Sequence, residues 1–313
     1  MRENDLLAWF AAHARRHPHV PVGIGDDMAG VTVHSHGGSA GAALALLKID
    51  QALDQVHFDL RRHTPRQAGI KAVNRCLSDC AAMACRPRAI LIAVALPQNA
   101  SEEMARELFA GAESAAAAFD CPIVGGDTAV WDQRLAITVA AMGDSPTLPV
   151  RRSGAAVGDA IVVTGSLGGS ILGRHLTFVP RIAEAQAMRQ VATIHSMMDI
   201  SDGLAQDLPR LLAASGVGAV VEAARIPIHP DAVILAGTDG QTALAHALAD
   251  GEDYELLFTV AGADLPRIQA LNLAANLTRI GAITAGQELI LQDQDGKRRP
   301  WPQGGWEYES SNP

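Results

Sequence analysis

The chain has 313 residues, of which 48% are hydrophobic, so it can bury a sizeable core and is long enough for two domains. Its formal net charge of −9 argues against a nucleic-acid or anionic-membrane surface, because such partners require clustered Lys and Arg. The longest wholly apolar run, residues 89–96, is too short to cross a bilayer, and the N-terminus does not show a basic segment followed by an apolar one. We therefore expect a globular cytoplasmic protein.

The first half of the chain alternates between strands and helices. An amphipathic helix is expected over residues 5–15, with Leu6, Leu7, Trp9 and Phe10 as its apolar stripe. Thr64, followed by Pro65, predicts a long helix to about Cys85, and Ser101 predicts another to about Phe119. Strands are predicted at residues 30–34, 44–50, 89–96, 123–124 and 135–142, with a flexible connection at 36–41. This order indicates an α+β domain.

A Pro-containing connector at residues 144–149 is the best candidate for a domain boundary. We place the domains at residues 1–146 and 147–313, the second with α/β character. A Gly-rich turn into a helix is expected at 165–173, and further helices after Pro180 and Ser201. Strands are predicted at residues 160–164, 218–222, 254–260 and 277–283. The C-terminal segment carries an aromatic cluster of Trp301, Trp306 and Tyr308, which either attaches the terminus to its domain or lines a site for a planar ligand.

The four cysteines are Cys76, Cys80, Cys85 and Cys121. Their spacing fits neither a zinc site nor a secreted disulfide framework, so we expect reduced residues in the core.

Acidic residues recur in segments that are otherwise poor in charge. They are Asp26 and Asp27 after a glycine turn, Asp50 at the end of a strand, Asp79 inside a helix, Asp127 after Gly125-Gly126, and Asp199 and Asp202 around Ser201. If these acids converge, cations must offset their repulsion, and carboxylates without basic partners favour Mg²⁺. The alternatives are a solvated turn for Asp27, an Arg75–Asp79 surface pair, a plain turn for Asp127, and helix N-capping by Ser201 or Asp202.

Other motifs limit the possible chemistry. The chain has no Gly-x-x-x-x-Gly-Lys-Ser/Thr sequence, which excludes a Walker-type P-loop, and no Gly-x-Ser-x-Gly motif supports a catalytic triad. The turn at residues 165–170 could offer backbone amides to a phosphate. Arg152 places a cation near the connector and would otherwise be a solvated residue, while His57, between Val56 and Phe58, is typical of a hydrogen-bonded core residue.

Taken together, seven segments resemble the thiamine-monophosphate kinase family of the ATP-binding superfamily that includes aminoimidazole ribonucleotide synthetase. Their order and spacing match over nearly the whole chain, and the absence of any Cys before Cys76 sets the chain apart from the selenophosphate synthetase branch. The matching segments are residues 23–27, 56–60, 69–83, 124–128, 152–155, 199–204 and 251–258.

This resemblance implies a two-domain architecture like that of aminoimidazole ribonucleotide synthetase, with an N-terminal sheet domain that forms a homodimer. It also implies the phosphorylation of thiamine monophosphate to thiamine diphosphate with ATP and several Mg²⁺ ions. The substrate phosphate is itself the nucleophile, so no catalytic side chain is expected beyond metal binding and positioning. The implied metal ligands are Asp27, Asp50, Asp79, Asp127, Asp199 and Asp202. The implied ATP contacts are Phe109, Gly126, Asp127, Arg152 and Ser201, and the implied substrate contacts are His57, Glu252 and Trp306.

The sequence shows one serious departure from the family. In the family, the two residues directly before the aspartate of the second strand are usually Ser or Thr. In this chain they are Lys48 and Ile49. In a strand, Lys48 and Asp50 project from the same face, so Lys48 should reach toward the acids, unless it extends to solvent. Two alternatives follow: a degenerate nucleotide-binding homologue without kinase activity, or a kinase for another small phosphorylated metabolite.

Overall fold

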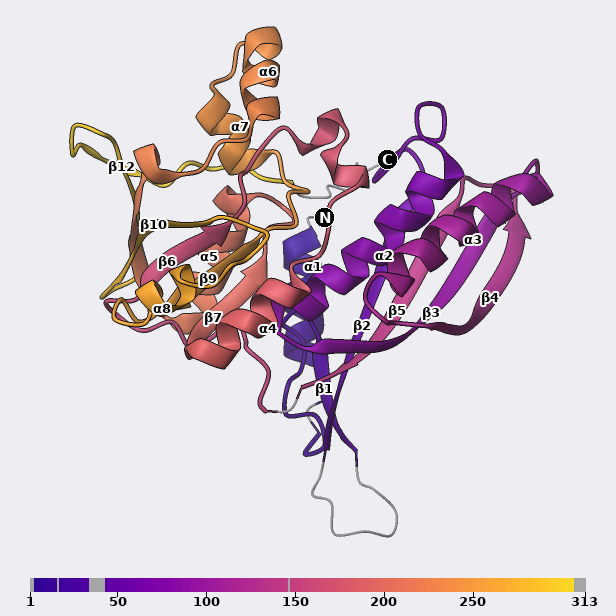
Figure 1. Ribbon diagram of the computed structural model, residues 1–313, viewed down its shortest axis with the longest axis horizontal. Helices are drawn as coiled ribbons and strands as arrows, with labels where there is room; N and C mark the ends of the chain where they lie inside the picture. Colours follow the sequence, from indigo (N-terminus) through magenta and orange to yellow (C-terminus); the bar gives the residue numbers. More distant parts are fainter. Residues whose placement is uncertain (1–2, 16, 34–42, 146, 307–313) are drawn as a thin grey trace.

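Two β-sheets, one in each half of the chain, form the frame of the molecule (Figure 1). The computed structural model describes residues 3–15, 17–33, 43–145 and 147–306. The connection expected at residues 36–41 and the aromatic residue Tyr308 lie outside this part of the chain. Two sheets with helices agree with the mixed α/β class expected from the sequence.

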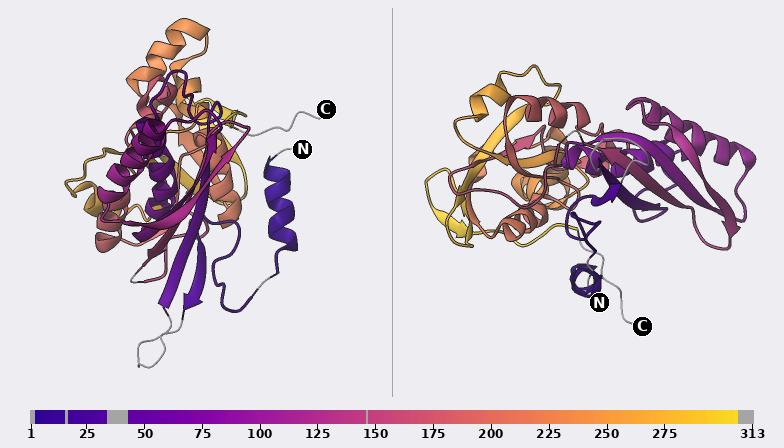
Figure 2. Two further views of the ribbon diagram at one scale, coloured as in Figure 1. Left: turned by 90° about the vertical axis from the view of Figure 1, so that its right-hand side faces the viewer. Right: turned by 90° about the horizontal axis from the view of Figure 1, so that it is seen from below.

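The N-terminal sheet has five strands in the order β1-β2-β5-β3-β4. All neighbouring strands pair antiparallel except β3 and β4, which are parallel. Helices α2 (Pro65–Ala82) and α3 (Glu102–Ala117) lie along one face of this sheet (Figure 2). The strands are β1 (Ala29–Val33), β2 (Ala43–Leu53), β3 (Arg86–Pro97), β4 (Ile123–Trp131) and β5 (Ala136–Asp144).

Both long helices begin at the caps predicted from the sequence. The Thr64 side chain accepts the backbone N–H of Gln67, and the Gln67 side chain accepts the N–H of Thr64, which completes a capping box. Ser101 accepts the N–H of Met104 at the start of α3. Most of α2 is buried because it packs against the N-terminal sheet and α3 and also against α4 and β7 of the second half.

The C-terminal sheet has seven strands in the order β12-β11-β8-β10-β6-β9-β7. They are β6 (Ala160–Thr164), β7 (Ile194–Asp199), β8 (Gly218–Glu222), β9 (Leu256–Val260), β10 (Leu277–Thr284), β11 (Leu289–Gln292) and β12 (Arg298–Pro300). The helices are α4 (Ile182–Val191), α5 (Leu204–Ser215), α6 (Pro230–Asp239), α7 (Ala243–Ala249) and α8 (Leu265–Gln269). The sequence reading did not identify β7, β11, β12 or the helices α6 to α8.

Two predicted elements were wrong. The strand expected to end at Val124 continues as β4 through both glycines and Asp127 to Trp131. A Cβ on Gly126 would lie 1.8 Å from the Ile92 carbonyl oxygen, so this glycine permits the close approach of β3 rather than a turn. The helix expected within residues 165–173 is instead the short 3₁₀ turns η1 (Ser170–Leu172) and η2 (Arg174–Leu176).

Helix α1 (Glu3–His13) forms where it was predicted but stands apart from both sheets (Figure 2). Trp9 and Phe10 are exposed, so the expected apolar stripe is not buried at these two positions. No helix in the described part of the chain is long and apolar enough to cross a lipid bilayer.

The larger hydrophobic core is shared by the two halves of the chain. It joins residues of α2 and the N-terminal sheet, such as Leu77 and Ile90, to residues of the second half, such as Met188 and Phe258. All four cysteines are buried and free, as predicted. A smaller core cluster lies wholly within the second half. The domain boundary near residue 146 stays a prediction, but both halves contribute to one packed interior.

Candidate functional site

A cavity of about 600 Å³ opens between the two halves. Its lining comes from β2 and the loop after it, α2, the segment before β6, η1, the end of β7 and the turn after it, α5, the end of α7 and the loop after it, and Trp306. Nine of the residues selected from the sequence line it or lie at its floor: Asp27, Asp50, His57, Asp79, Arg152, Asp199, Ser201, Asp202 and Glu252. Trp306 is the tenth.

Three buried carboxylates meet at the floor of the cavity. Asp27 lies on the glycine turn before β1, Asp79 in the last turn of α2, and Asp199 at the end of β7. One oxygen from each lies within 4.8 Å of the others. Burial, together with the neighbouring negative charge of Asp27, raises the pKa of Asp199 to about 6. Three of the acids expected to converge thus lie together, and the burial of Asp27 rules out a solvated turn at this position.

The Ser78-Asp79 pair has a structural reason for interrupting an apolar helix. The Ser78 hydroxyl donates to Asp199 Oδ2 at 2.6 Å, across the junction of the two halves. Asp79 Oδ1 lies 3.0 Å from Lys48 Nζ. The alternative of an exposed Arg75–Asp79 pair fails because Asp79 is buried and takes Lys48 as its cation. Lys48 reaches the acids as the strand periodicity predicted.

Arg152, in the segment before β6, holds the turn that carries Asp26 and Asp27. Its Nη2 donates to Asp27 Oδ1 at 2.6 Å, and its backbone N–H donates to Asp26 Oδ1 at 2.9 Å. Asp27 Oδ2 is buried and has no hydrogen-bond partner among the described residues. A buried carboxylate oxygen without a partner, beside two further carboxylates, suits a hard divalent cation, which takes oxygen ligands.

The turn between β7 and α5 is fixed by its own helix. The N-cap of α5 is Gly203, with no side-chain cap, so the interpretation of Ser201 or Asp202 as a capping residue was wrong. Instead, Asp207 Oδ2 accepts the backbone N–H groups of Ser201 and Asp202 at 3.1 and 3.0 Å. Arg210 pairs with both Asp202 and Asp207. The side chains of Ser201 and Asp202 are therefore left at the cavity wall.

A buried lysine organises another part of the wall. Lys71 of α2 is fully buried and donates to Glu252 Oε2 at 2.7 Å and to the His57 carbonyl, and its Nζ lies 2.7 Å from His175 Nδ1. Burial lowers the pKa of Lys71 to about 8. Burial and the charge of Arg75 lower the pKa of His57 to about 3, so its imidazole is neutral at neutral pH. Since His57 Nδ1 accepts the Leu53 N–H at 3.0 Å, Nε2 carries the proton.

The loop that carries Glu252 has an unusual backbone. Glu252 and Tyr254 have φ values of 53° and 52°, in the left-handed region that such residues rarely occupy. Its acids have separate anchors: Asp253 accepts the Gly168 N–H and pairs with Arg174, and Asp250 Oδ2 accepts the Gly169 N–H.

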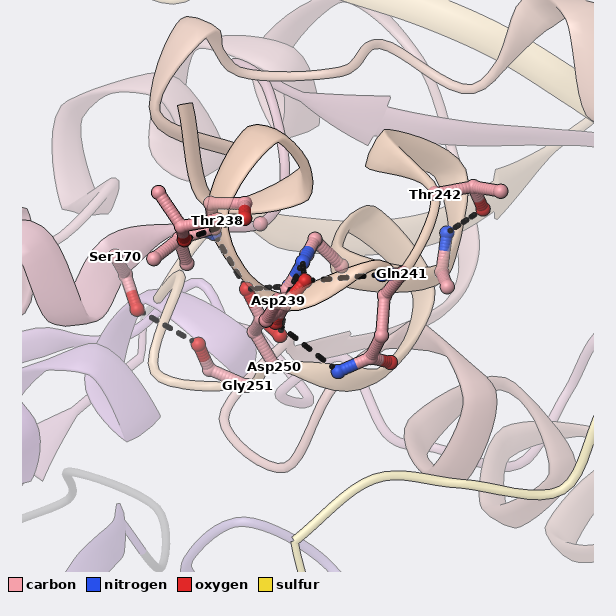
Figure 3. A network of polar contacts seen from close by, with 12 residues as sticks. Ser170, Thr238, Asp239, Gln241, Thr242, Asp250 and Gly251 are labelled. Atoms are coloured by element: carbon pink, nitrogen blue, oxygen red, sulfur yellow. Dashed lines mark hydrogen bonds and ion pairs between the residues drawn. The ribbon is translucent and has the colours of Figure 1, made fainter. Parts of the chain in front are cut away.

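Ser170 fixes the same loop by donating to the Gly251 carbonyl at 2.8 Å (Figure 3). The network in Figure 3 continues from Asp250 toward the end of α6 and the start of α7. In the Gly-rich turn at residues 165–170, the backbone N–H groups of Gly168 and Gly169 and the Ser170 hydroxyl are therefore hydrogen-bonded to this loop.

The C-terminal aromatic residues are attached to α5. The Trp301 indole donates to the Ala205 carbonyl, and Gln206 Nε2 donates to the Trp306 carbonyl, both at 2.9 Å. The Trp306 side chain is half exposed and lines the cavity. The attachment of the terminus to its domain is thus confirmed, whereas a planar ligand at Trp306 stays a prediction.

Three residues selected from the sequence lie outside the cavity: Phe109, Gly126 and Asp127. Phe109 is exposed on α3. In the strand register, Asp127 is in the row of Ala93, Thr138 and Gln51, so it projects from the face opposite to that of Asp50. Three strand spacings, roughly 14 Å, separate the two acids within one chain. Within one chain, these two acids cannot bind the same metal ion. A shared ion would require Asp50 of one molecule and Asp127 of another.

The residues that sequence reasoning missed are mainly the supports of the loops: His175, Arg174, Asp207 and Arg210. Lys71 stood inside a matching segment, but nothing in the sequence marked it as buried. Only Asp207 and Arg210 left a signal, as an acid and a base one helical turn apart directly after the acidic turn.

Comparison with known proteins shows the family to which the chain belongs. Residues 25–144 match the AIR synthase related protein, N-terminal domain, and residues 156–294 match the corresponding C-terminal domain. The chain therefore belongs to the AIR synthase related family of two-domain proteins.

Within that family it is a member of the thiamine-monophosphate kinases. It is 38% identical to the thiamine-monophosphate kinase of Rhodopirellula baltica, over 96% of both chains. The solved structure of AaThiL complexed with AMPPCP and TMP matches 98% of this chain and 96% of its own, with a TM-score of 0.80 and 27% identity. The structure of tt0281 from Thermus thermophilus matches with the same TM-score and 30% identity, over 96% of this chain and 98% of its own.

Proposed function

We propose that this protein transfers the terminal phosphoryl group of ATP to thiamine monophosphate and so makes thiamine diphosphate. The observation that carries the proposal is the meeting of Asp27, Asp79 and Asp199 at the floor of the cavity between the halves. The family supports it, since the curated relatives are named thiamine-monophosphate kinases and AaThiL was solved with AMPPCP, an ATP analogue, and TMP.

Asp27, Asp50, Asp79, Asp199 and Asp202 would hold Mg²⁺ at the cavity. Bound Mg²⁺ would neutralise charge on the phosphate oxygens during transfer. The protein fixes this acidic set through Arg152, Ser78 and Asp207, which act on Asp27, Asp199 and the turn at Asp202 respectively. Arg152 and Ser201, which face the same space, would contact ATP.

His57, Glu252 and Trp306 would bind thiamine monophosphate. The neutral His57 presents a donor at Nε2, Glu252 an acceptor carboxylate, and Trp306 an apolar ring, so together they offer complementary contacts to a small heterocyclic phosphate. Since the phosphate of the substrate is the nucleophile, these residues bind and orient it, and none needs to form a covalent intermediate.

A homodimer would bring Gly126 and Asp127 of β4 toward the site of a second molecule, whereas Phe109 lies on α3, which covers the other face of the sheet. The face of the N-terminal sheet that carries Asp127 also exposes Leu47, Ile49, Leu91 and Met142. These four positions lie on adjacent strands and form a continuous apolar surface, which a second copy of the sheet would cover. Such a pairing would bring the β4 edge of one molecule toward the other. We place the enzyme in the cytoplasm, where ATP is available.

The direct test is formation of thiamine diphosphate from ATP and thiamine monophosphate with Mg²⁺, followed by chromatography. Wild-type protein should be active, and Asp79→Asn should lose at least about 100-fold in turnover because it removes a carboxylate from the floor. Asp120→Asn, at an exposed position outside the cavity, is the matched control and should keep full activity.

AMPPCP binding and ATP consumption with other acceptors, measured beside this assay, separate the alternatives. A degenerate homologue would bind AMPPCP without turning over ATP. A kinase for another metabolite would consume ATP with a different phosphorylated acceptor and leave thiamine monophosphate unchanged. Either result would contradict the proposed function.

A further inference from the structure

Lys48 is a fixed cation among the carboxylates of the acidic floor. It pairs with Ala141 of β5, as Asp50 pairs with Val139, and both of these partners are buried. Lys48 and Asp50 therefore project together from the helix-covered face of the sheet. The Lys48 ammonium lies 3.0 Å from Asp79 Oδ1 and 3.7 Å from Asp50 Oδ1, and less than a quarter of the side chain is exposed.

The fixed cations divide the acidic floor into two parts. Arg152 contacts Asp27 on one side, and Lys48 contacts Asp50 and Asp79 on the other. Together with Asp199, which lies beside them, these acids make four carboxylates. The four carboxylates and the two contacting cations, Arg152 and Lys48, have a formal charge of −4 + 2 = −2. A serine or threonine at position 48 would leave −3 and an oxygen ligand in place of the ammonium.

We propose that the Lys48 ammonium takes the place of one divalent cation between Asp50 and Asp79, so that this chain binds one Mg²⁺ fewer than it would with Ser or Thr at position 48. The inference rests on the metal site of the proposed function.

The chemistry of the ammonium supports this inference. A protonated lysine has three donors and no lone pair, so it cannot be a metal ligand, but it neutralises carboxylates within hydrogen-bond distance. The electrostatic repulsion it exerts on a divalent ion disfavours a metal at the same oxygens. The Lys48 side chain is covalently part of the protein and cannot leave the site as a bound Mg²⁺ ion can. It therefore offsets the repulsion between Asp50 and Asp79 even when Mg²⁺ is absent.

The test compares wild type with Lys48→Ser by two measurements that need no turnover. Calorimetric titration of Mg²⁺ in the presence of AMPPCP should show one more bound ion per chain in the variant. Melting temperature in EDTA should fall by several degrees in the variant, and saturating Mg²⁺ should close most of this gap. Lys48→Arg retains the charge and should keep the stoichiometry of wild type.

Lys297→Ser is the matched control, because it removes the same charge from an exposed position outside the cavity lining. It should change neither stoichiometry nor the dependence of melting on Mg²⁺. If Lys48→Ser does not fold even with Mg²⁺, Lys48→Gln has the same expected stoichiometry and a side chain of more similar length.

Equal Mg²⁺ stoichiometry in wild type and in the folded uncharged variant would overturn the inference, as would the absence of Mg²⁺ binding in both. A different result would contradict the proposed function. A protein that shows the expected difference in Mg²⁺ binding but does not phosphorylate thiamine monophosphate contradicts the function and leaves the inference on Lys48 intact.

Discussion

Glu252 owes its ionisation to its neighbours. Burial alone would raise its pKa, but His175 and Lys71 outweigh burial and lower it to about 2, from an ordinary value of 4.5. Because the folded-state pKa is depressed, the stabilisation is complete above about pH 4.5 and is lost as the pH falls toward 2. Lys71 and His175 are thus supports for the ionised form of a proposed substrate contact.

We therefore expect Glu252→Gln to lower the free energy of unfolding more near pH 6 than near pH 3, with a difference between the two pH values of about 1–3 kcal/mol. Urea unfolding at both pH values measures it. Glu113→Gln, at an exposed position of α3, is the control and should show no such difference. A constant effect of Glu252→Gln at both pH values would show that Lys71 and His175 do not hold the carboxylate in its ionised form.

The residues of the site were predictable to different degrees. The acids could be selected from the sequence because clustered charges in apolar segments need a reason, and Ser78-Asp79 in a helix was the clearest example. Lys71 could not be selected in this way, because its burial depends on the packing of α2 against the second half. The caps at Thr64 and Ser101 are local hydrogen bonds, and for that reason the sequence located both helices well.

At the scale of elements, β4 shows why glycines mislead. Gly125-Gly126 is typical of the end of a strand, but the pair lies within β4, where Gly126 lets β3 approach. Nothing local distinguishes a glycine that ends a strand from one that allows two strands to pack closely. Because β4 continues, Asp127 lies on an edge strand and on the open face of the sheet.

The position of Asp127 leads to a complementation experiment. Asp79→Asn and Asp127→Asn should each be inactive alone. If Asp127 acts in the site of the second molecule, co-expression of the two in equal amounts should restore about one quarter of wild-type activity, because half of the dimers are mixed and each has one intact site.

Asp79→Asn co-expressed with Asp199→Asn is the control, since both acids belong to one chain's floor and no intact site can form. A monomer by light scattering at micromolar concentration, or no recovery in dimers shown to be mixed, would contradict the shared site.

At the scale of the whole molecule, the two sheets share one core. We expect a single unfolding transition in calorimetry, with equal calorimetric and van't Hoff enthalpies. Leu77→Ala in the shared core and Leu208→Ala in the smaller cluster of the second half should both lower that same transition, each by about 2–5 kcal/mol of stability. Two separated transitions, each sensitive to only one substitution, would show that the halves unfold independently.

The shared core also restricts how ligands reach the cavity. Leu77 and Met188 belong to one packed cluster, and Ser78 is hydrogen-bonded to Asp199 across the same junction. A hinge rotation that separated the halves would expose this interior to water, at a cost that grows with the apolar area uncovered. ATP and its acceptor therefore enter through the mouth of a cavity whose walls are already in place, and any gating motion belongs to surface segments rather than to the two halves.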